Sequence, residues 1–195
     1  IQSLSYLGEI YMRLQKYDKA LQYFEKALQT AIKCGYRKSE ITILTKIGRT
    51  HALEGKHLGE VVKPFDKALF FTREILDKNL EITVLNNLGD ALKDIGQYEA
   101  AEEAYNSAKE VAQKIGNKRA VLITLNKKAE AYLIAEQLEE AIQTFKHALE
   151  LAQSTDAKSI YARAQAGLGV ALRLKGEDME LARTYLEQSL THFQE

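Results

Sequence analysis

The sequence of 195 residues has one cysteine, one proline, no tryptophan and no excess of charge of either sign. Cys34 alone cannot form an internal disulfide, so we expect a reducing compartment and predict a cytoplasmic protein. Lys and Arg total 27, as do Asp and Glu, which argues against the basic surface of a nucleic-acid-binding or membrane-surface protein. No apolar run approaches the roughly 20 residues of a membrane-spanning helix. We therefore expect no nucleic-acid partner and no membrane partner.

Motifs for catalysis and cofactor binding are also missing. The four histidines show no HxxxH spacing, and no CxxC pair occurs, so we expect no metal site. Neither GxGxxG nor GxxxxGK[ST] is present, so no nucleotide or dinucleotide cofactor is expected. Acidic residues are numerous but spread over the polar faces of the expected helices. We therefore expect no catalytic residues, no cofactor and no enzyme activity in this chain.

The sequence instead repeats itself about every 40 residues. When it is aligned with itself at that shift, four columns of small or bulky apolar residues line up five times. These columns are Gly8, Gly48, Gly89, Ala129, Gly169; Ala20, Val61, Ala101, Ala141, Ala182; Phe24, Phe65, Tyr105, Phe145, Leu186; and Ala27, Ala68, Ala108, Ala148, Ser189. A small residue opposite a bulky one allows two helices to approach closely.

Each repeat shows the three- and four-residue apolar spacing of two amphipathic helices. The pattern predicts ten helices, near residues 2–15, 18–34, 38–54, 59–77, 79–95, 98–115, 118–135, 138–153, 157–175 and 179–193. Glycines 55, 96 and 176 lie between the two helices of their repeats, where a left-handed residue ends a helix. Pro64 falls inside a predicted helix and should either delay its start or kink it. Lys128 replaces an apolar residue, and we expect its stem to be buried with the ammonium at the surface.

The motif Leu7-Gly8-x-x-Tyr11, followed by Ala20, Phe24 and Ala27, resembles the tetratricopeptide repeat, with Leu4 at the place of the usual Trp. The resemblance covers the whole chain and is closest to the variety with repeats of 40 residues. It implies an all-α fold, a right-handed α-solenoid of five antiparallel helix pairs. The single array would divide into repeats at about 1–36, 37–78, 79–117, 118–156 and 157–195.

The resemblance also implies which side of the array binds ligands. In tetratricopeptide stacks the first helices of the repeats line a concave groove, and their apolar columns face the other way. Partner-binding residues are then expected in the columns headed by Gln2, Ser5, Glu9, Met12 and Arg13. The candidate site residues are Glu9, Arg13, Thr45, Arg49, Asn86, Asp90, Lys93, Asn126, Glu130, Leu133 and Arg173.

Two features of this groove have alternative interpretations. Asn86 and Asn126 share one column. Their carboxamides could form hydrogen bonds with the backbone of an extended peptide, or with polar groups of a neighbouring helix in the same chain. Toward the C-terminus the groove is more apolar, through Ile123, Leu133, Ile134, Val170 and Leu174. These side chains could hold an amphipathic helix of a partner, or they could pack on the adjacent first helices. The mixed charges do not match the Lys/Asn clamp that some members use for a terminal carboxylate.

We therefore predict a non-catalytic scaffold that binds a protein or peptide, such as a signalling adaptor. One alternative is the sensor or regulatory arm of a multidomain signalling protein, such as a transcription regulator, an ATPase or a protease. Another is self-assembly into a homo-oligomer, because Ser3, Leu7, Ile10 and Leu14 at one end and Leu186, Leu190 and Phe193 at the other lack polar caps. For the same reason we expect a fragment of a longer protein, or ends that another copy covers.

Overall fold

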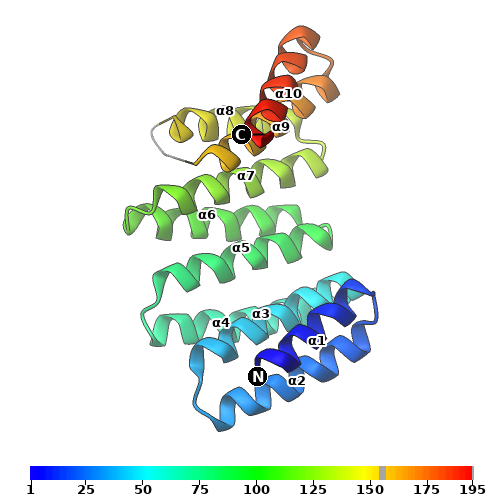
Figure 1. Cartoon of the computed structure of the whole chain (residues 1–195), viewed down its shortest axis with the longest axis vertical. Coiled ribbons are helices and arrows are strands. Elements are labelled where there is room, and N and C mark those ends of the chain that lie inside the picture. The colour runs from blue at the N-terminus through cyan, green and yellow to red at the C-terminus, as the bar shows by residue number, and fades with distance from the viewer. Residues whose placement is uncertain (154–156, 195) are drawn as a thin grey trace. The chain divides into compact units, whose positions relative to one another are not determined.

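The computed structural model describes residues 1–153 and 157–194, with side chains through residue 191. The described part folds into ten α-helices joined by short turns (Figure 1). They are α1 (Gln2–Arg13), α2 (Tyr17–Lys33), α3 (Arg37–Glu54), α4 (Leu58–Glu74), α5 (Lys78–Asp94), α6 (Tyr98–Lys114), α7 (Lys118–Ile134), α8 (Leu138–Ala152), α9 (Lys158–Lys175) and α10 (Met179–Gln194). The predicted all-α class is confirmed. Within the described residues, no helix is both long enough and apolar enough to cross a membrane.

The chain divides into two compact units, residues 1–100 and 101–195. In unit 1, α1 packs on α2 and α3 packs on α4, and α5 contacts both α3 and α4. In unit 2, α7 pairs with α8 and α9 with α10, while α8 packs on α9. Successive helices therefore form the expected antiparallel hairpins, which follow each other in chain order within each unit (Figure 1).

The core of the first two hairpins is the predicted fit of a small residue against a ring. Phe24, Phe65 and Phe145 have no exposed surface. A Cβ atom added to Gly48 would lie only 2.5 Å from Cε2 of Phe65, and one added to Gly8 would collide with the ring of Phe24. Glycine is required at these two positions because the ring occupies the space of a side chain. The predicted pairing of these two columns is confirmed.

The turn inside each hairpin needs a left-handed residue at one fixed position. Gly55, Gly96 and Gly176 take φ values of 78°, 75° and 75°, as predicted. The other two hairpins place Gln15 and Glu136 there, with φ values of 57° and 60°. All five repeats therefore use the same turn, although only glycine adopts this backbone region without strain.

The predicted helix boundaries hold to within about two residues, except at the end of α4. We predicted residues 59–77, but the helix ends at Glu74. Leu76 takes a φ of 54°, and Asp77 caps the next helix by accepting a hydrogen bond of 3.0 Å from the Leu80 amide. Pro64 lies within α4, which begins at Leu58, so the proline does not delay the helix start. The predicted turn at 154–156 lies outside the described residues.

Lys128 is held by polar partners on α6. Its ammonium lies 2.9 Å from Glu102 Oε1 and 2.9 Å from Asn106 Oδ1, and its side chain is 15% exposed. Burial alone would raise the pKa of the Glu102 carboxyl, but hydrogen bonds from Tyr132 and Lys128 outweigh it and hold that pKa below its ordinary value. The stem of Lys128 is buried as expected, with its charge paired at the end.

Candidate functional site

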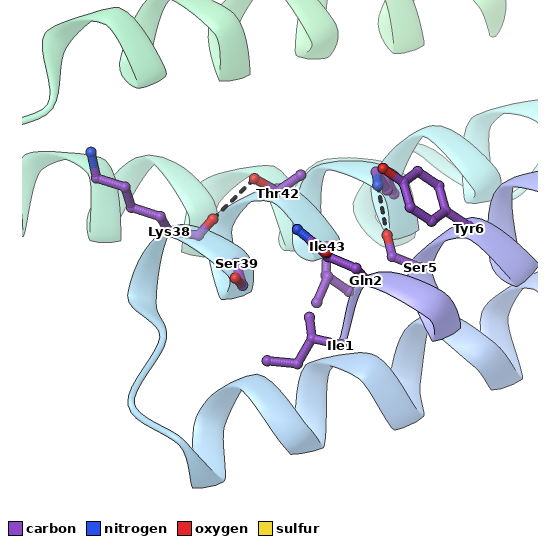
Figure 2. Close-up of a pocket in the computed structure, with 9 residues that line it drawn as sticks. Ile1, Gln2, Ser5, Tyr6, Lys38, Ser39, Thr42 and Ile43 are labelled. Atoms are coloured by element: carbon purple, nitrogen blue, oxygen red, sulfur yellow. Dashed lines mark hydrogen bonds between the residues drawn. The ribbon is translucent and has the colours of Figure 1, made fainter.

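Two pockets lie between α1 and α3, the first helices of the first two hairpins. The first pocket, of about 250 Å³, is drawn in Figure 2 and is lined by Ile1, Gln2, Ser5, Tyr6, Lys38, Ser39, Thr42, Ile43 and Lys46. The second, of about 390 Å³, is lined by Glu9, Met12, Arg13, Lys46, Arg49 and Leu53. The backbones of α1 and α3 approach each other less closely than those of α3 and α5, which leaves room for these pockets.

Lys46 joins the two pockets, because it lines both of them. Its ammonium donates a hydrogen bond of 2.6 Å to Ser5 Oγ, drawn in Figure 2, and lies 2.7 Å from Glu9 Oε1. Both partners are on α1, and the Lys46 side chain is 21% exposed. The pairing fixes the Glu9 carboxylate and the Lys46 ammonium at the boundary between the two pockets.

Three predicted site residues meet in the second pocket. Glu9 and Arg13 come from α1, and Arg49 comes from α3. Both arginines are exposed, and within the described residues no hydrogen bond or ion pair engages either guanidinium. Thr45 is different, because it is buried and its hydroxyl donates a hydrogen bond of 2.9 Å to the Ile41 carbonyl of its own helix. Thr45 is 7% exposed and therefore offers little surface to a ligand.

The predicted site residues on α5 are buried or half-buried. Asp90 and Lys93 are half-buried, and the Lys93 ammonium lies 3.4 Å from Asp94 Oδ1. Asn86 is only 6% exposed. A ligand on this helix would therefore meet charged groups at its surface and little of the Asn86 carboxamide.

The side chain of Asn126 on α7 forms a hydrogen bond with a neighbouring helix. It is 2% exposed, and its Nδ2 donates a hydrogen bond of 3.1 Å to the backbone carbonyl of Ile160 on α9. Glu130, one turn further along α7, pairs with Arg163 of α9 through contacts of 2.5 and 2.7 Å. These side chains link two first helices, and that use of Asn126 is the second of the two interpretations given above.

Apolar and cationic side chains are exposed where α7 and α9 end. Ile134 is 54% exposed and Leu174 is 55% exposed, and the two occupy the same column on adjacent first helices. Leu133 is half-buried beside Ile134, and Arg173 is exposed beside Leu174. At these four positions, unit 2 offers a ligand apolar surface next to one positive charge.

We call the exposed side of α1, α3, α5, α7 and α9 the first-helix surface, and describe it separately for each unit. In unit 1 it is formed chiefly by Glu9, Arg13, Lys46, Arg49, Leu53 and Lys93, and in unit 2 by Glu130, Leu133, Ile134, Arg173 and Leu174. Lys46 was not among the predicted site residues. Its column, headed by Tyr6, lies about 20° beyond the Arg13 column at 100° per residue, and this closeness could have identified it.

The apolar flank predicted on α1 is exposed. Leu7, Ile10 and Leu14 are 39%, 52% and 57% exposed, whereas Ile47 and Thr50, in the columns of Leu7 and Ile10 on α3, are buried. Leu190 on α10 is 63% exposed, and Phe193 lies outside the residues whose side chains are described. In the described ranges, no three or more His, Cys, Asp or Glu residues come together in a way that could hold a metal ion.

The comparisons with known proteins agree with these hairpins. The family model for the tetratricopeptide repeat matches residues 1–59, 80–154 and 120–195. Outer dynein arm-docking complex subunit 4 of Danio rerio is 27% identical over 149 residues, which are 76% of this chain and 30% of that protein. The chain thus spans about a third of the length of this curated relative.

Solved structures show the same fold at low identity. Aspartyl phosphate phosphatase F from Bacillus subtilis matches 98% of this chain and 50% of its own with a TM-score of 0.81 and 17% identity. NprR, solved in complex with its cognate peptide NprX, matches 96% of this chain and 53% of its own with a TM-score of 0.63 and 19% identity.

Proposed function

The chain belongs to the tetratricopeptide repeat family, and from that premise we propose that it is a non-catalytic scaffold that binds a protein or peptide on the first-helix surface. The family typically mediates protein and peptide binding. In this proposal the first helices present the groups that contact the partner, and the second helices support them from behind.

The observation that carries the proposal is the pair of pockets between α1 and α3. They lie on the face that the resemblance to the family implies for ligands, and Glu9, Arg13 and Arg49 line the second one. Binding sites are typically hollows with a few polar groups and apolar surface. The second pocket has both, because Met12 and Leu53 lie beside its charged groups.

Unit 2 supports the proposal with a different surface. Exposed Ile134 and Leu174 offer apolar contact, and Arg173 lies next to Leu174. A partner with an apolar face and an acidic rim would match this arrangement. The solved complex of NprR with its cognate peptide supports peptide binding by a related fold.

The test begins with a random twelve-residue peptide library displayed on phage and selected against the whole chain. Affinities of the selected peptides are then measured for Arg49→Glu in unit 1 and Leu174→Asp in unit 2. We expect each selected peptide to lose about tenfold or more in affinity for at least one of these variants.

The matched controls carry the same changes on second helices. Lys63→Glu on α4 reverses an exposed charge, and Leu190→Asp on α10 alters a leucine that is 63% exposed. Both should bind the selected peptides like the natural chain. The proposal is wrong if the control variants lose binding while Arg49→Glu and Leu174→Asp keep it, or if no peptide is selected above background.

A second candidate function is a regulatory arm of a larger signalling protein. Its support is that the chain spans only 50% of aspartyl phosphate phosphatase F and 53% of NprR. In that case the first-helix surface would bind a regulatory peptide or another domain of the same protein. Reading the open reading frame on both sides of this sequence tests the idea, since the absence of any further domain would contradict it.

A third candidate is self-association through the exposed flank of α1. Leu7, Ile10 and Leu14 occupy a face whose equivalents Ile47 and Thr50 on α3 are buried. Sedimentation velocity over a range of concentrations should then show a dimer that Ile10→Asp dissociates. A monomer at all concentrations would contradict self-association without affecting peptide binding.

A further inference from the structure

We propose that the second pocket of unit 1, formed by Glu9, Met12, Arg13, Lys46, Arg49 and Leu53, binds the side-chain carboxylates of an acidic peptide segment that also carries apolar residues. The inference rests on the proposed function, because it names the chemistry of the ligand at one part of the first-helix surface. It concerns α1 and α3 alone.

The charges of the pocket are unbalanced. Three cationic side chains face one carboxylate, and that carboxylate, on Glu9, is already paired with Lys46 at 2.7 Å. The guanidinium groups of Arg13 and Arg49 are exposed, and nothing in the described part of the chain pairs with either of them. A guanidinium offers a planar set of donors that fits a carboxylate through two hydrogen bonds. An incoming carboxylate would therefore supply the acceptor that the protein itself does not provide.

Apolar surface lies next to these cations. Leu53 is 43% exposed and follows Arg49 by four residues on α3, so the two side chains are neighbours on one face. Met12 is half-buried beside Arg13 on α1. A segment that carries acidic and apolar side chains on the same face would place a carboxylate against the arginines and an alkyl group against Leu53.

The position of Lys46 favours an internal segment over a chain terminus. Because Lys46 lines both pockets, they adjoin along α1 and α3, and in the first Gln2, Ser5 and Thr42 offer polar groups. From Gln2 to Arg13 the helix axis advances about 16 Å, which matches about five residues of an extended peptide. A peptide backbone can therefore run along both pockets, and we assign the carboxylates to side chains of that segment.

The experiment uses fluorescein-labelled peptides with the order Glu-Glu-Leu-Leu-Glu-Glu-Leu, blocked at both ends, and measures their affinity for the whole chain by anisotropy. In an extended peptide this order puts Glu and Leu side chains on each face. Matched peptides carry Gln or Lys in place of Glu. We expect the Glu peptide to bind about tenfold more tightly than the Gln peptide and the Lys peptide to bind most weakly. The advantage of the Glu peptide should shrink as salt is added.

Variants of the pocket give effects of opposite sign. The double variant Arg13→Gln with Arg49→Gln should lose about tenfold in affinity for the Glu peptide. The Glu9→Gln variant removes the competing carboxylate and releases Lys46, so it should bind the Glu peptide about threefold more tightly. A double variant with the same loss of charge elsewhere, Arg119→Gln with Arg183→Gln, should bind like the natural chain.

Several results would overturn the assignment. These are equal affinity for the Glu and Gln peptides, no binding of the Glu peptide at all, equal losses in the two double variants, or binding only when the peptide keeps a free terminal carboxylate. If the Gln peptide binds and Leu174→Asp or Arg49→Glu weakens it, the proposed function stands and only the carboxylate assignment fails. If Lys63→Glu or Leu190→Asp weakens binding instead, the proposed function itself fails.

Discussion

The carboxamide nitrogen of Asn126 donates a hydrogen bond of 3.1 Å to the backbone carbonyl of Ile160, and so links α7 to α9 inside unit 2. Asn126 is 2% exposed. We predict that Asn126→Ala lowers the free energy of unfolding by about 1–3 kcal/mol, because it removes a hydrogen bond between two helices and the packing of a buried side chain. Urea denaturation measures the change.

The control for Asn126 is Asn87→Ala. Asn87 is half-buried, and its Nδ2 donates only to the Thr83 carbonyl of its own helix, at 2.8 Å. We expect this variant to change the free energy of unfolding by less than about 0.5 kcal/mol. Equal losses in the two variants would show that the link between the two helices is not what Asn126 contributes.

The carboxylate of Glu81 should make unit 1 sensitive to acid. Burial alone would raise the pKa of Glu81, but hydrogen bonds from Lys78 and Arg73, at 2.8 and 3.1 Å, outweigh burial and hold that pKa below its ordinary value. Because the folded state has the lower pKa, these pairs stabilise it above about pH 4 and are lost as the pH falls through the folded-state pKa.

We therefore expect Glu81→Gln to lower the free energy of unfolding by about 1–3 kcal/mol at pH 7 and by progressively less below about pH 4. Denaturant titrations of both proteins at a series of pH values measure this difference. A difference that does not change between neutral and acidic pH would mean that the charge of Glu81 is not involved.

Glu136 occupies the turn position that three other repeats give to glycine. Its φ of 60° is strained for a residue with a Cβ atom, so we predict that Glu136→Gly raises the free energy of unfolding by about 0.5–1 kcal/mol. The reverse change, Gly96→Ala, should lower the free energy of unfolding by about 1 kcal/mol. The φ of Gly96 is 75°, and no atom lies within 4 Å of an added Cβ, so backbone strain alone would cause this loss. Thermal melting measures both, and a stabilising Gly96→Ala would contradict the strain argument.

The pair of Glu102 and Lys128, 2.9 Å apart, replaces apolar residues found in the same columns of other repeats. We predict that Lys128→Leu alone destabilises unit 2 by about 0.5–1 kcal/mol, because Glu102 loses this partner while its side chain, 39% exposed, stays partly in water. Adding Glu102→Leu should recover most of the lost free energy of unfolding. A double-mutant cycle in urea measures the coupling, and additive effects of the two changes would contradict a specific pair.

The repeated columns made the hairpins predictable from the sequence. Gly8 and Phe24 lie in columns of one small and one bulky residue, and helical spacing alone puts them face to face, as the structure confirms. The end of α4 was not predictable in this way. Ile75 and Leu76 continue the apolar pattern of the helix, and only the left-handed backbone at Leu76 ends it.

The sequence predicts which candidate residues lie on the same side of the first helices. It does not predict which of these side chains are buried or which hydrogen bonds they form. Glu9, Arg13 and Arg49 meet in one pocket because their two columns lie about 40° apart on the same side of the first helices. Burial of Asn126 depends on how closely α9 approaches α7, and the bond from Lys46 to Ser5 joins residues 41 positions apart. Neither distance can be obtained from the pattern of a single helix.

The most direct test of the central proposal is a cross-linking map of the bound partner. A peptide selected from the phage library is fitted with a photoreactive group, irradiated on the whole chain, and its attachment points are found by mass spectrometry. We predict that they fall on α1, α3, α5, α7 or α9, on exposed residues such as Arg13, Arg49 or Leu174. Attachment confined to α2, α4, α6, α8 and α10 would contradict the proposal that the first helices bind the partner.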